Sequence, residues 1–339
     1  MSVVSTIIGT AERVPLPDVV IRAAIQRLCS RTAMRLSALG AADDAAFAGK
    51  MMLRPIAGEA DAGHHEAPVS FFAQVLGPNL KYSSCFYKTD ASTLQEAEEE
   101  ALRQSVAHAG IADGQTILEL GCGWGSLSLW MARQFPHATI TAVSNSQAQS
   151  AHVEDIARQR GLLNLRVVTA DMNVFAPDGQ FDRIVSIEMF EQMLNWRKLL
   201  TRVRSWLAPE GRFFMHVVTH RSGSHLCDRT DREDWIAQHI FTEGLMPSHH
   251  LVRQFGDIFT IEKEWCWSGT HYQRTAHDWL ANFDAHRDTI EAALRDLYGE
   301  ETAQWMRRWR WFLLATSGLF GYADGTEWGV SRYRMKAAA

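Results

Sequence analysis

Paired cysteines, long apolar runs and an excess of positive charge are all missing from this sequence of 339 residues. The cysteines are dispersed and odd in number, which argues against a zinc site and favours reduced thiols; they are Cys29, Cys85, Cys122, Cys227 and Cys266. No apolar run reaches the roughly 18 residues of a membrane span, and the N-terminus lacks the charged start and apolar core of a signal peptide. A net charge of −5 lacks the basic footprint typical of nucleic-acid binding.

Metal-ligand spacing is absent as well. His64–His65 and His249–His250 are adjacent pairs, whose side chains rarely share a metal, and there is no HExxH pattern. The length and the 46% of hydrophobic residues indicate one large globular domain with a sizeable elaboration, or two domains. We therefore expect a soluble, cytoplasmic protein with no metal, no nucleic-acid partner and no stable membrane insertion.

Residues 1–60 carry mostly helical patterns. Residues 18–36 are amphipathic, and the pattern places on one side Val19, Ile21, Ile25, Leu28 and Met34. Residues 58–70 resemble a linker or a mobile loop. Residues 92–110 predict a strong helix, in which Ser92 and Gln95 form a capping box and Gly110 follows the last turn.

Strands alternate with helices from residue 114 to residue 220, which predicts a parallel sheet covered on both faces. The apolar runs that predict strands are residues 115–120, 138–145, 164–171, 181–188 and 211–220, the last after a turn at 209–211. Beyond residue 220 the alternation stops. We expect a mostly helical insertion over 231–256, a strand over 259–269, helices to about residue 320, and a final strand over 328–336.

A glycine-rich loop follows the first of these strands, in the stretch ILELGCGWGS (117–126). Gly121, Gly123 and Gly125 allow the backbone to approach a ligand, and the following helix offers unpaired N–H groups there. A dinucleotide site would show GxGxxG with an acid after the second strand. Here the spacing is GxGxG, the second strand ends without a carboxylate, and Glu119 stands before the loop. This arrangement suits a ligand with a cationic amino-acid moiety, such as S-adenosylmethionine (SAM); the alternative is a tight turn without a ligand.

The motifs resemble a known family. ILELGCGWGSLSLWMAR resembles motif I of class I SAM-dependent methyltransferases. LKYSSCFYK, VSNSQAQ, IEMFEQMLNW, GLMPS and GTHYQRTAHDW resemble the cyclopropane-fatty-acid synthase superfamily, and within it most closely the coclaurine N-methyltransferase group. The resemblance covers roughly residues 64–336. It implies an α/β fold with a Rossmann-like core built on a mostly parallel seven-stranded sheet, and it makes a homodimer plausible.

The resemblance also implies cofactor roles for individual residues. Tyr82, Ser83, Glu119 and the three glycines would bind the methionine end of SAM. The ribose would be held, without an acid, by Ser144, Asn145 and Gln149. Asp171 and Met172 would lie at the adenine. The implied division is an N-terminal helical cap with a cofactor-covering segment over 1–109, a SAM-binding core over 110–220, and a helical acceptor-binding lid with closing strands over 221–339.

Two glutamates, Glu188 and Glu191, end the fourth strand, where the resemblance places the methyl acceptor. One interpretation is that they solvate a helix start, since helix N-termini attract acids. The other is that they orient an amine and remove its proton, with one pKa raised by the close pairing. On a helical turn, Glu188 would face the same way as Glu191 and Gln192. The resemblance adds Tyr272 to the acceptor pocket, and His271 is either a further pocket residue or a hydrogen-bonded, partly buried imidazole.

The sequence departs from the family at two positions. Gln192 stands where the family usually has histidine, and an amide cannot shuttle a proton at neutral pH. Ser84 stands where the cyclopropane synthases have a cysteine near a bicarbonate ion. The expected activity is therefore SAM-dependent N-methylation of a small, aromatic, benzylisoquinoline-like amine. The alternatives are methyl or methylene transfer to an unsaturated acyl lipid, and a non-catalytic SAM-binding protein, against which the intact glycine loop argues.

The aromatic helix predicted near the C-terminus, residues 304–322, has two interpretations. Trp305, Trp309, Phe312 and Thr316 recur at helical spacing, which favours packing in the core or against the acceptor. A helix lying in a membrane interface would need a similar composition. Aromatic rings here would suit a flat or cationic acceptor.

Overall fold

A seven-stranded sheet with helices on both faces forms the centre of the computed structural model, which describes residues 16–58, 67–227 and 244–339. The strand order is β3-β2-β1-β4-β5-β9-β8, with β9 and β8 antiparallel and all the other pairs parallel. The strands are β1 Thr116–Leu120, β2 Thr139–Ser144, β3 Leu165–Thr169, β4 Phe181–Ile187, β5 Leu207–His220, β8 Phe259–Ser268 and β9 Trp328–Ala337. The expected mostly parallel class I methyltransferase sheet is confirmed.

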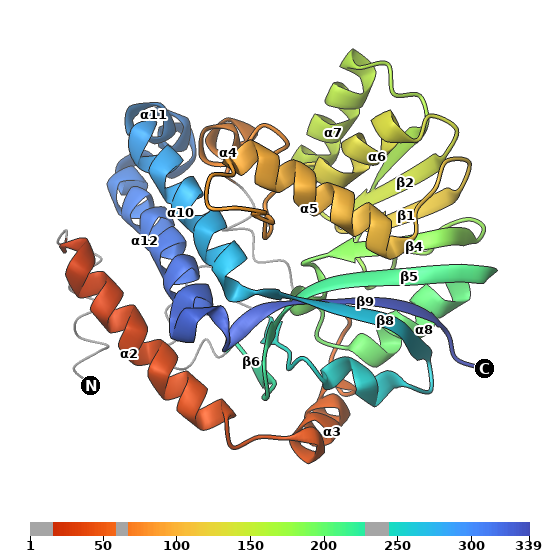
Figure 1. Ribbon diagram of the computed structural model, residues 1–339. Coiled ribbons are helices and arrows are strands. Elements are labelled where there is room, and N and C mark those ends of the chain that lie inside the picture. Colours follow the sequence, from red (N-terminus) through yellow and green to blue (C-terminus); the bar gives the residue numbers. More distant parts are fainter. Residues whose placement is uncertain (1–15, 59–66, 228–243) are drawn as a thin grey trace.

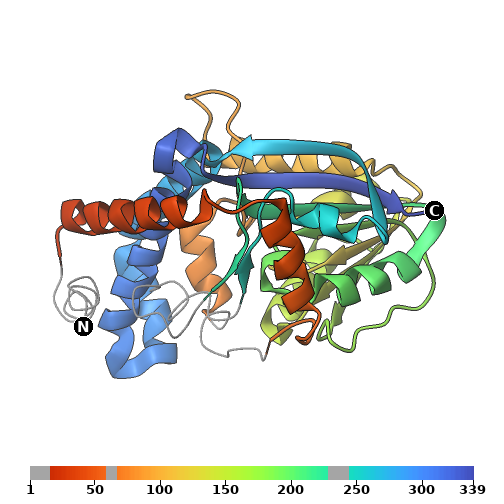
Figure 2. The ribbon, with the colours of Figure 1, turned by 90° about the horizontal axis from the view of Figure 1, so that it is seen from below.

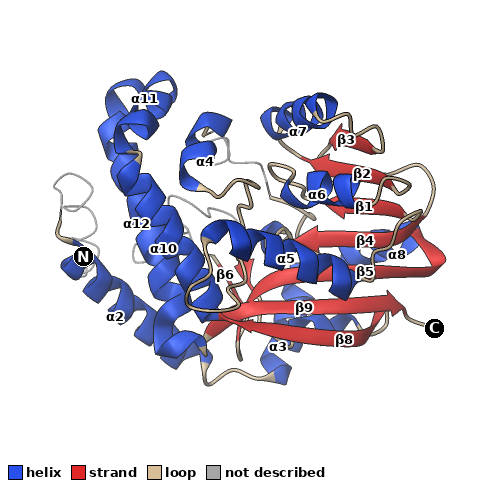
Figure 3. Ribbon diagram, turned by 45° about the horizontal axis from the view of Figure 1, so that its top comes forward, coloured by secondary structure: helices blue, strands red, loops and turns tan. Residues whose placement is uncertain are grey.

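Helices cover both faces of this sheet (Figure 3). Leu102 of α5 and Met131 of α6 pack on one face, and Ala48 of α3 and Leu200 of α8 pack on the other. The helices that flank the sheet are α3 Ala41–Met51, α5 Leu94–Ala109, α6 Ser126–Gln134, α7 Gln147–Gln159 and α8 Trp196–Trp206. Their apolar sides bury most of β1 and β5, whereas β3 and β8 stay partly exposed.

A second group of helices stands at one end of the sheet (Figure 1). It contains α4 Val69–Val75, α10 Gly269–Ala285, α11 Arg287–Tyr298 and α12 Thr302–Gly321. These helices share a core of their own, in which Phe71, Trp279, Phe283 and Trp309 are buried. The aromatic stretch near the C-terminus is therefore a core-facing helix, as expected.

Helix α2, Asp18–Leu36, has the predicted bounds, and part of its predicted inner face is buried. Ile21 and Ile25 pack against the core of the second helix group, whereas Val19 and Met34 are 72% and 67% exposed. Figure 2 shows α2 beside α12, where a Cβ on Gly318 would come within 2.5 Å of Ile25. The predicted face is therefore confirmed in the middle of the helix and wrong at Val19 and Met34 near its two ends.

Two local predictions were shifted. The capping box of α5 is formed by Thr93 and Glu96 instead of Ser92 and Gln95, because the Thr93 side chain accepts from Glu96 N while the Glu96 carboxylate accepts from Thr93 N. Gly110 ends this helix in the left-handed region, as expected. Residues 209–211 lie within β5 as an irregularity and not as a separate turn, because the register with β4 shifts between Phe181 and Arg183.

The remaining connections are short. Beyond β5 come β6 His225–Leu226, β7 Leu245–Met246 and the 3-10 helix η2 Leu251–Phe255. Of the predicted helical insertion, only 244–256 is described, and it contains β7 and η2 instead of a long helix. The predicted linker at 58–70 and the His64–His65 pair lie largely outside the described residues. Within the described residues, no helix is long and apolar enough to cross a membrane.

Candidate functional site

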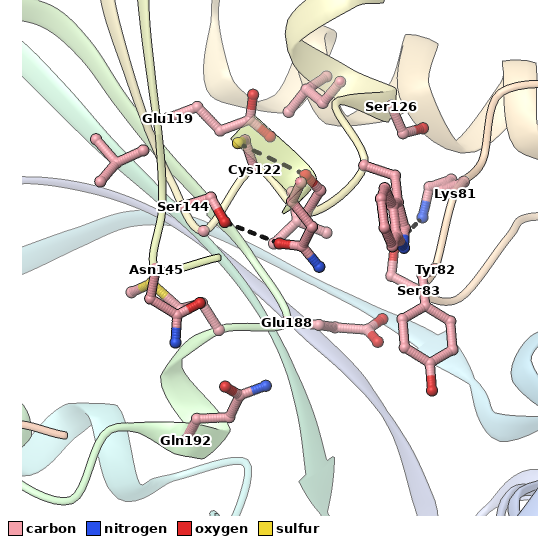
Figure 4. Close-up of a pocket in the computed structure, with 18 of the residues that line it drawn as sticks. Lys81, Tyr82, Ser83, Glu119, Cys122, Ser126, Ser144, Asn145, Glu188 and Gln192 are labelled. Atoms are coloured by element: carbon pink, nitrogen blue, oxygen red, sulfur yellow. Dashed lines mark hydrogen bonds between the residues drawn. The ribbon is translucent and has the colours of Figure 1, made fainter. Parts of the chain in front are cut away.

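A cavity opens where the parallel strands end (Figure 4). It lies between the glycine loop, residues 80–83 and helix α12. It is lined by ten of the eleven residues that were expected at the cofactor: Tyr82, Ser83, Glu119, Gly121, Gly123, Ser144, Asn145, Gln149, Asp171 and Met172. The eleventh, Gly125, lies directly behind the wall as the N-cap of α6. What each residue contacts in a bound cofactor stays a prediction.

The three glycines of the loop differ in the space around them, although all three have positive φ. A Cβ on Gly121 would come within 2.9 Å of Met189, and one on Gly125 within 2.6 Å of Val153, so these two glycines permit close packing. A Cβ on Gly123 would meet no atom within 4 Å, because it would project into open space. Gly123 is therefore the position where the backbone is bare toward a ligand, as a close-fitting cradle requires.

Glu119 is a carboxyl group enclosed in the cavity wall. It is 2% exposed, and its Oε2 accepts a short hydrogen bond from Ser128 Oγ. Burial raises the pKa of Glu119 to about 7, against which the hydrogen bond from Ser128 counts for less. A cationic amino group would restore the ionised carboxylate. The arrangement therefore fits the amino-acid end of SAM.

The far wall of the cavity is polar but uncharged at the end of β2. Ser144 Oγ donates to Gln149 Oε1 at 2.8 Å and accepts from Ser146 N at 3.0 Å. Asn145 lies beside them in the lining. These groups offer amide and hydroxyl partners where a dinucleotide-binding protein would place an acid.

Glu188 lies one residue beyond β4 with a φ of 49°, a conformation that is uncommon for a side chain with a Cβ. Its Oε1 accepts from Ser84 N at 2.9 Å and from His216 Nε2 at 3.1 Å, and its Oε2 accepts from Tyr272 Oη at 2.9 Å. Burial alone would raise the pKa of Glu188, but the hydrogen bond from His216 and the charge of Lys81 outweigh it and hold the pKa below its usual value. The carboxylate is therefore ionised at neutral pH.

His216 is the neutral partner in this contact. Burial lowers the pKa of its imidazole to about 4, so its Nε2 donates as an uncharged N–H. His216 pairs with Ile187 in the register of β4 and β5, which brings it beside Glu188 at the carboxyl ends of both strands.

Comparisons with known proteins agree with this geometry. The family model described as mycolic acid cyclopropane synthetase matches residues 57–325. The chain belongs to this family. It is 34% identical over 277 residues to (S)-coclaurine N-methyltransferase of Thalictrum flavum subsp. glaucum, which covers 80% of this chain and 77% of the relative. It is 29% identical over 269 residues to cyclopropane-fatty-acyl-phospholipid synthase of Escherichia coli (strain K12), covering 79% of this chain and 65% of the relative.

Solved structures lead to the same family. A crystal structure of coclaurine N-methyltransferase bound to N-methylheliamine and SAH superposes with a TM-score of 0.90 and 31% identity, covering 98% of each chain. A mycolic acid cyclopropane synthase in complex with SAH has a TM-score of 0.65 at 23% identity, which shows the shared fold. The protein is a SAM-dependent methyltransferase.

The two glutamates of this methyltransferase have separate environments. Gln192 lines the cavity with Glu188, but Glu191, between them in the 3-10 turn η1 Phe190–Gln192, does not. Its Oε1 accepts from Val218 N at 2.5 Å, and its buried Oε2 has no hydrogen-bond partner among the described residues. Burial, and after it the charge of Glu188, raises the pKa of Glu191 well above its usual value. Of the three side chains expected to face the same way, Glu188 and Gln192 therefore line the cavity and Glu191 does not.

The motif at the start of α10 also separates its two candidates. Tyr272 lines the cavity, whereas His271 does not. His271 Nδ1 accepts from Tyr87 N at 3.2 Å, and its ring stacks on Phe86 with ring centroids 4.1 Å apart. His271 is thus the hydrogen-bonded, partly buried imidazole that was one of the two sequence interpretations.

Sequence reasoning missed several residues of the methyltransferase site. His216 carried a usable signal, because it is a histidine within the apolar strand that follows β4, and the register of β4 and β5 places it opposite Ile187, next to Glu188. Lys81, Trp124 and Met189 also line the cavity, and their sequence positions gave no separate signal. Within the described residues, no group of three metal-ligating side chains is present; His249, of the second histidine pair, bonds to Ser331 Oγ at 2.8 Å.

Proposed function

We propose that this methyltransferase transfers the methyl group of SAM to the nitrogen of a small aromatic amine of the benzylisoquinoline kind. The observation that carries the proposal is the Glu188 carboxylate, buried and held ionised on the wall of the cavity that also contains the cofactor residues. SAM supplies an electrophilic methyl group on a sulfonium sulfur. The similarity to coclaurine N-methyltransferases over four fifths of the chain supports an amine as the acceptor.

The proposed roles follow from the position of each side chain. Glu188 attracts the acceptor nitrogen through an N–H group and directs the nitrogen lone pair toward the methyl carbon. As the new N–C bond forms, the C–S bond breaks and its electrons remain on sulfur. The N–H proton then passes to Glu188 and on to water. Gln192 takes no proton in this scheme, and Glu191 takes no part in it because it does not line the cavity.

Aromatic rings form the rest of the proposed acceptor site. Tyr82 packs against Phe72 and Trp279 with ring centroids 5.0 and 5.7 Å apart, so its ring is fixed over the cavity. Trp309 and Phe312 of α12 line the same space. Rings held in this way favour a flat, cationic product through stacking and cation–π contact.

The second candidate is methyl or methylene transfer to an unsaturated acyl lipid. The family description and the similarity to the Escherichia coli synthase favour it. The residues that line the cavity favour the amine, because the proposed base is a fixed side chain, Glu188. Position 84 is a serine, and its N–H binds that side chain.

A mass-spectrometric competition assay separates these candidates. The protein and SAM are offered tetrahydroisoquinolines and aryl-alkyl amines in one pot and unsaturated phospholipid vesicles in another, with Glu188→Gln and Glu191→Gln run alongside. We expect a methylated amine that Glu188→Gln no longer forms. Modified acyl chains with unchanged amines would overturn the amine proposal. Retained SAM binding without any product would indicate the non-catalytic alternative.

The proposal includes a cytoplasmic enzyme that acts as a homodimer. Cys29, Cys85, Cys122 and Cys266 are free thiols, which suits a reducing compartment. Val19 and Met34 of α2 present apolar surface to solvent that a second copy would cover. Sedimentation at monomer mass would overturn the dimer, and cell fractionation checks the compartment. The proposed division of labour remains a cap over 1–109, a SAM-binding core over 110–220 and an acceptor lid over 221–339.

A further inference from the structure

Lys81 is a lysine enclosed at the boundary between the two halves of the cavity. It is 3% exposed, and it belongs to the cover segment, residues 77–84. Its Nζ donates to Ser83 Oγ and to the Ser84 carbonyl, both at 2.6 Å. Among the described residues, no carboxylate forms an ion pair with it. Burying an ammonium group without a carboxylate partner is costly, so its position calls for a functional reason.

The two groups that Lys81 holds belong to different halves of the site. Ser83 lines the cavity at the predicted cofactor end. Ser84 offers its N–H to Glu188 Oε1 at 2.9 Å, at the acceptor end. The N–H of Ser84 binds Glu188, and the carbonyl of the same residue binds Lys81. Lys81 therefore fixes the orientation of Ser84 through this carbonyl. One ammonium group therefore connects the cofactor contact with the acceptor carboxylate (Figure 4).

The backbone at Lys81 is anchored independently of its ammonium group. Glu98, buried on α5, accepts from Asn79 N at 2.9 Å and from Lys81 N at 3.3 Å. Gly77 makes room for it, since a Cβ there would come within 2.5 Å of Glu98. Replacing the Lys81 side chain should therefore leave the cover segment attached, while the turn over Ser83 and Ser84 becomes less fixed.

We propose that Lys81 is a positioning residue, whose ammonium group sets Ser83 against the cofactor and aims the Ser84 N–H at Glu188. Its charge acts on Glu188 together with the other groups that face this carboxylate. These groups are His216 from β5, Tyr272 from α10, Tyr82 from the cover segment, Cys85 directly after it and Glu191 from η1. His216 lowers the pKa of Glu188 more than Lys81 does, and burial lowers the pKa of Lys81 itself.

Binding of SAH to three variants tests the proposal without any acceptor. Lys81→Met removes the charge and both hydrogen bonds, and Lys81→Arg keeps a charged donor. Lys88→Met is the control, because it removes an exposed lysine just beyond the cover segment. By titration calorimetry we expect about tenfold weaker SAH binding for Lys81→Met, from the loss of two charged hydrogen bonds. Lys81→Arg should stay within about threefold of the parent, as partial rescue by a charged donor predicts, and Lys88→Met should equal it.

The pH profile of kcat/KM is a second readout, which a merely structural role of Lys81 would not change. Only this measurement rests on the proposed N-methylation. Removing the charge beside Glu188 should move the acid limb of the kcat/KM profile upward by about one pH unit in Lys81→Met and leave it in place in Lys81→Arg. Equal SAH affinity in all the variants, or equal loss in Lys81→Met and Lys81→Arg, would overturn the proposal. If Lys81→Met does not fold, Lys81→Gln, which keeps a neutral donor, provides the same comparison. A failed amine assay with intact SAH results would instead count against the proposed function.

Discussion

The two ends of the cavity are built in different ways. At the cofactor end, Glu119, the glycine loop and Ser144 come from one stretch of β1, α6 and β2, and their geometry depends on local backbone conformation. At the acceptor end, Glu188 is held by Ser84, Tyr272 and His216, which lie 104, 84 and 28 residues away. A local motif can therefore encode the cofactor end, whereas the acceptor end exists only after the chain has folded.

The two ends also treat a buried carboxyl group in opposite ways. Burial raises the pKa of Glu119 to about 7, with one serine as its donor. Glu188 is equally enclosed, yet three donors and a nearby lysine hold its pKa below the usual value. Burial raises the pKa of both groups; the hydrogen bonds and charges around Glu188 outweigh this effect, whereas the single hydrogen bond from Ser128 to Glu119 does not.

The largest expected effect is that of Glu188→Gln, which should reduce turnover at the acceptor end and leave SAH binding at the cofactor end nearly unchanged. Glu188→Gln places an NH2 group against donors that need an acceptor, and it removes the charge that orients the amine. We expect kcat/KM for the amine to fall by about 10³-fold. SAH affinity, measured by calorimetry, should stay within about threefold, because the cofactor end is built from other residues. An equal loss of SAH binding would show that the two ends are not separable.

Gly123→Ala should give the next largest effect, at the cofactor end. The new methyl group projects into the cavity, and we expect about 50-fold weaker SAH binding. Gly161→Ala is a matched control, since Gly161 also has a positive φ, 65° against 53°, and open space around its Cβ. Both variants should lose about 1–2 kcal/mol of stability by thermal unfolding. Equal SAH affinity in the two variants would contradict the role of Gly123 as the bare backbone position.

A smaller effect should appear as a pH dependence at Glu119. With a pKa of about 7 in the free protein, this carboxyl must lose its proton before it can bind a cationic amino group. SAH affinity should therefore fall as the pH drops below 7, by at most about tenfold per unit. Glu119→Gln should bind about tenfold more weakly at pH 8 and remove this dependence. Calorimetry from pH 6 to 8 checks both, and a dependence that persists in the variant would assign it elsewhere.

The smallest effect on activity should come from Glu191→Gln, because Glu191 lies outside the cavity lining and burial, by raising its pKa, disfavours its charged form. We expect kcat/KM at pH 7 to change by less than about threefold. Stability gives the sharper test. A raised pKa in the folded state means that the stability contributed by Glu191 is present below 4.5 and is lost as the pH rises toward its folded pKa. The Tm of the variant relative to the parent should therefore increase with pH above 4.5, and a constant difference would show that Glu191 is ionised.

Much of the fold could be predicted because its signals are local. The bounds of α2, the order of the central strands and the glycine loop follow from apolar spacing and glycine positions. The exposure of Val19 and Met34 could not be predicted from the pattern of α2, because the helix packs against α12, almost three hundred residues away. Glu191, which the sequence placed near the acceptor, and His271, for which it left two interpretations open, both lie outside the cavity lining.

The sequence by itself determined the cofactor cradle, since a strand, three glycines and a helix in register require only neighbouring residues to adopt their preferred conformations. It also determined the family, whose motifs are contiguous. Only the tertiary structure decided which of two glutamates three residues apart has a lowered pKa and which a raised one. That outcome depends on three donors from three distant segments, and their free energy of interaction with a buried charge exists only when all of them meet.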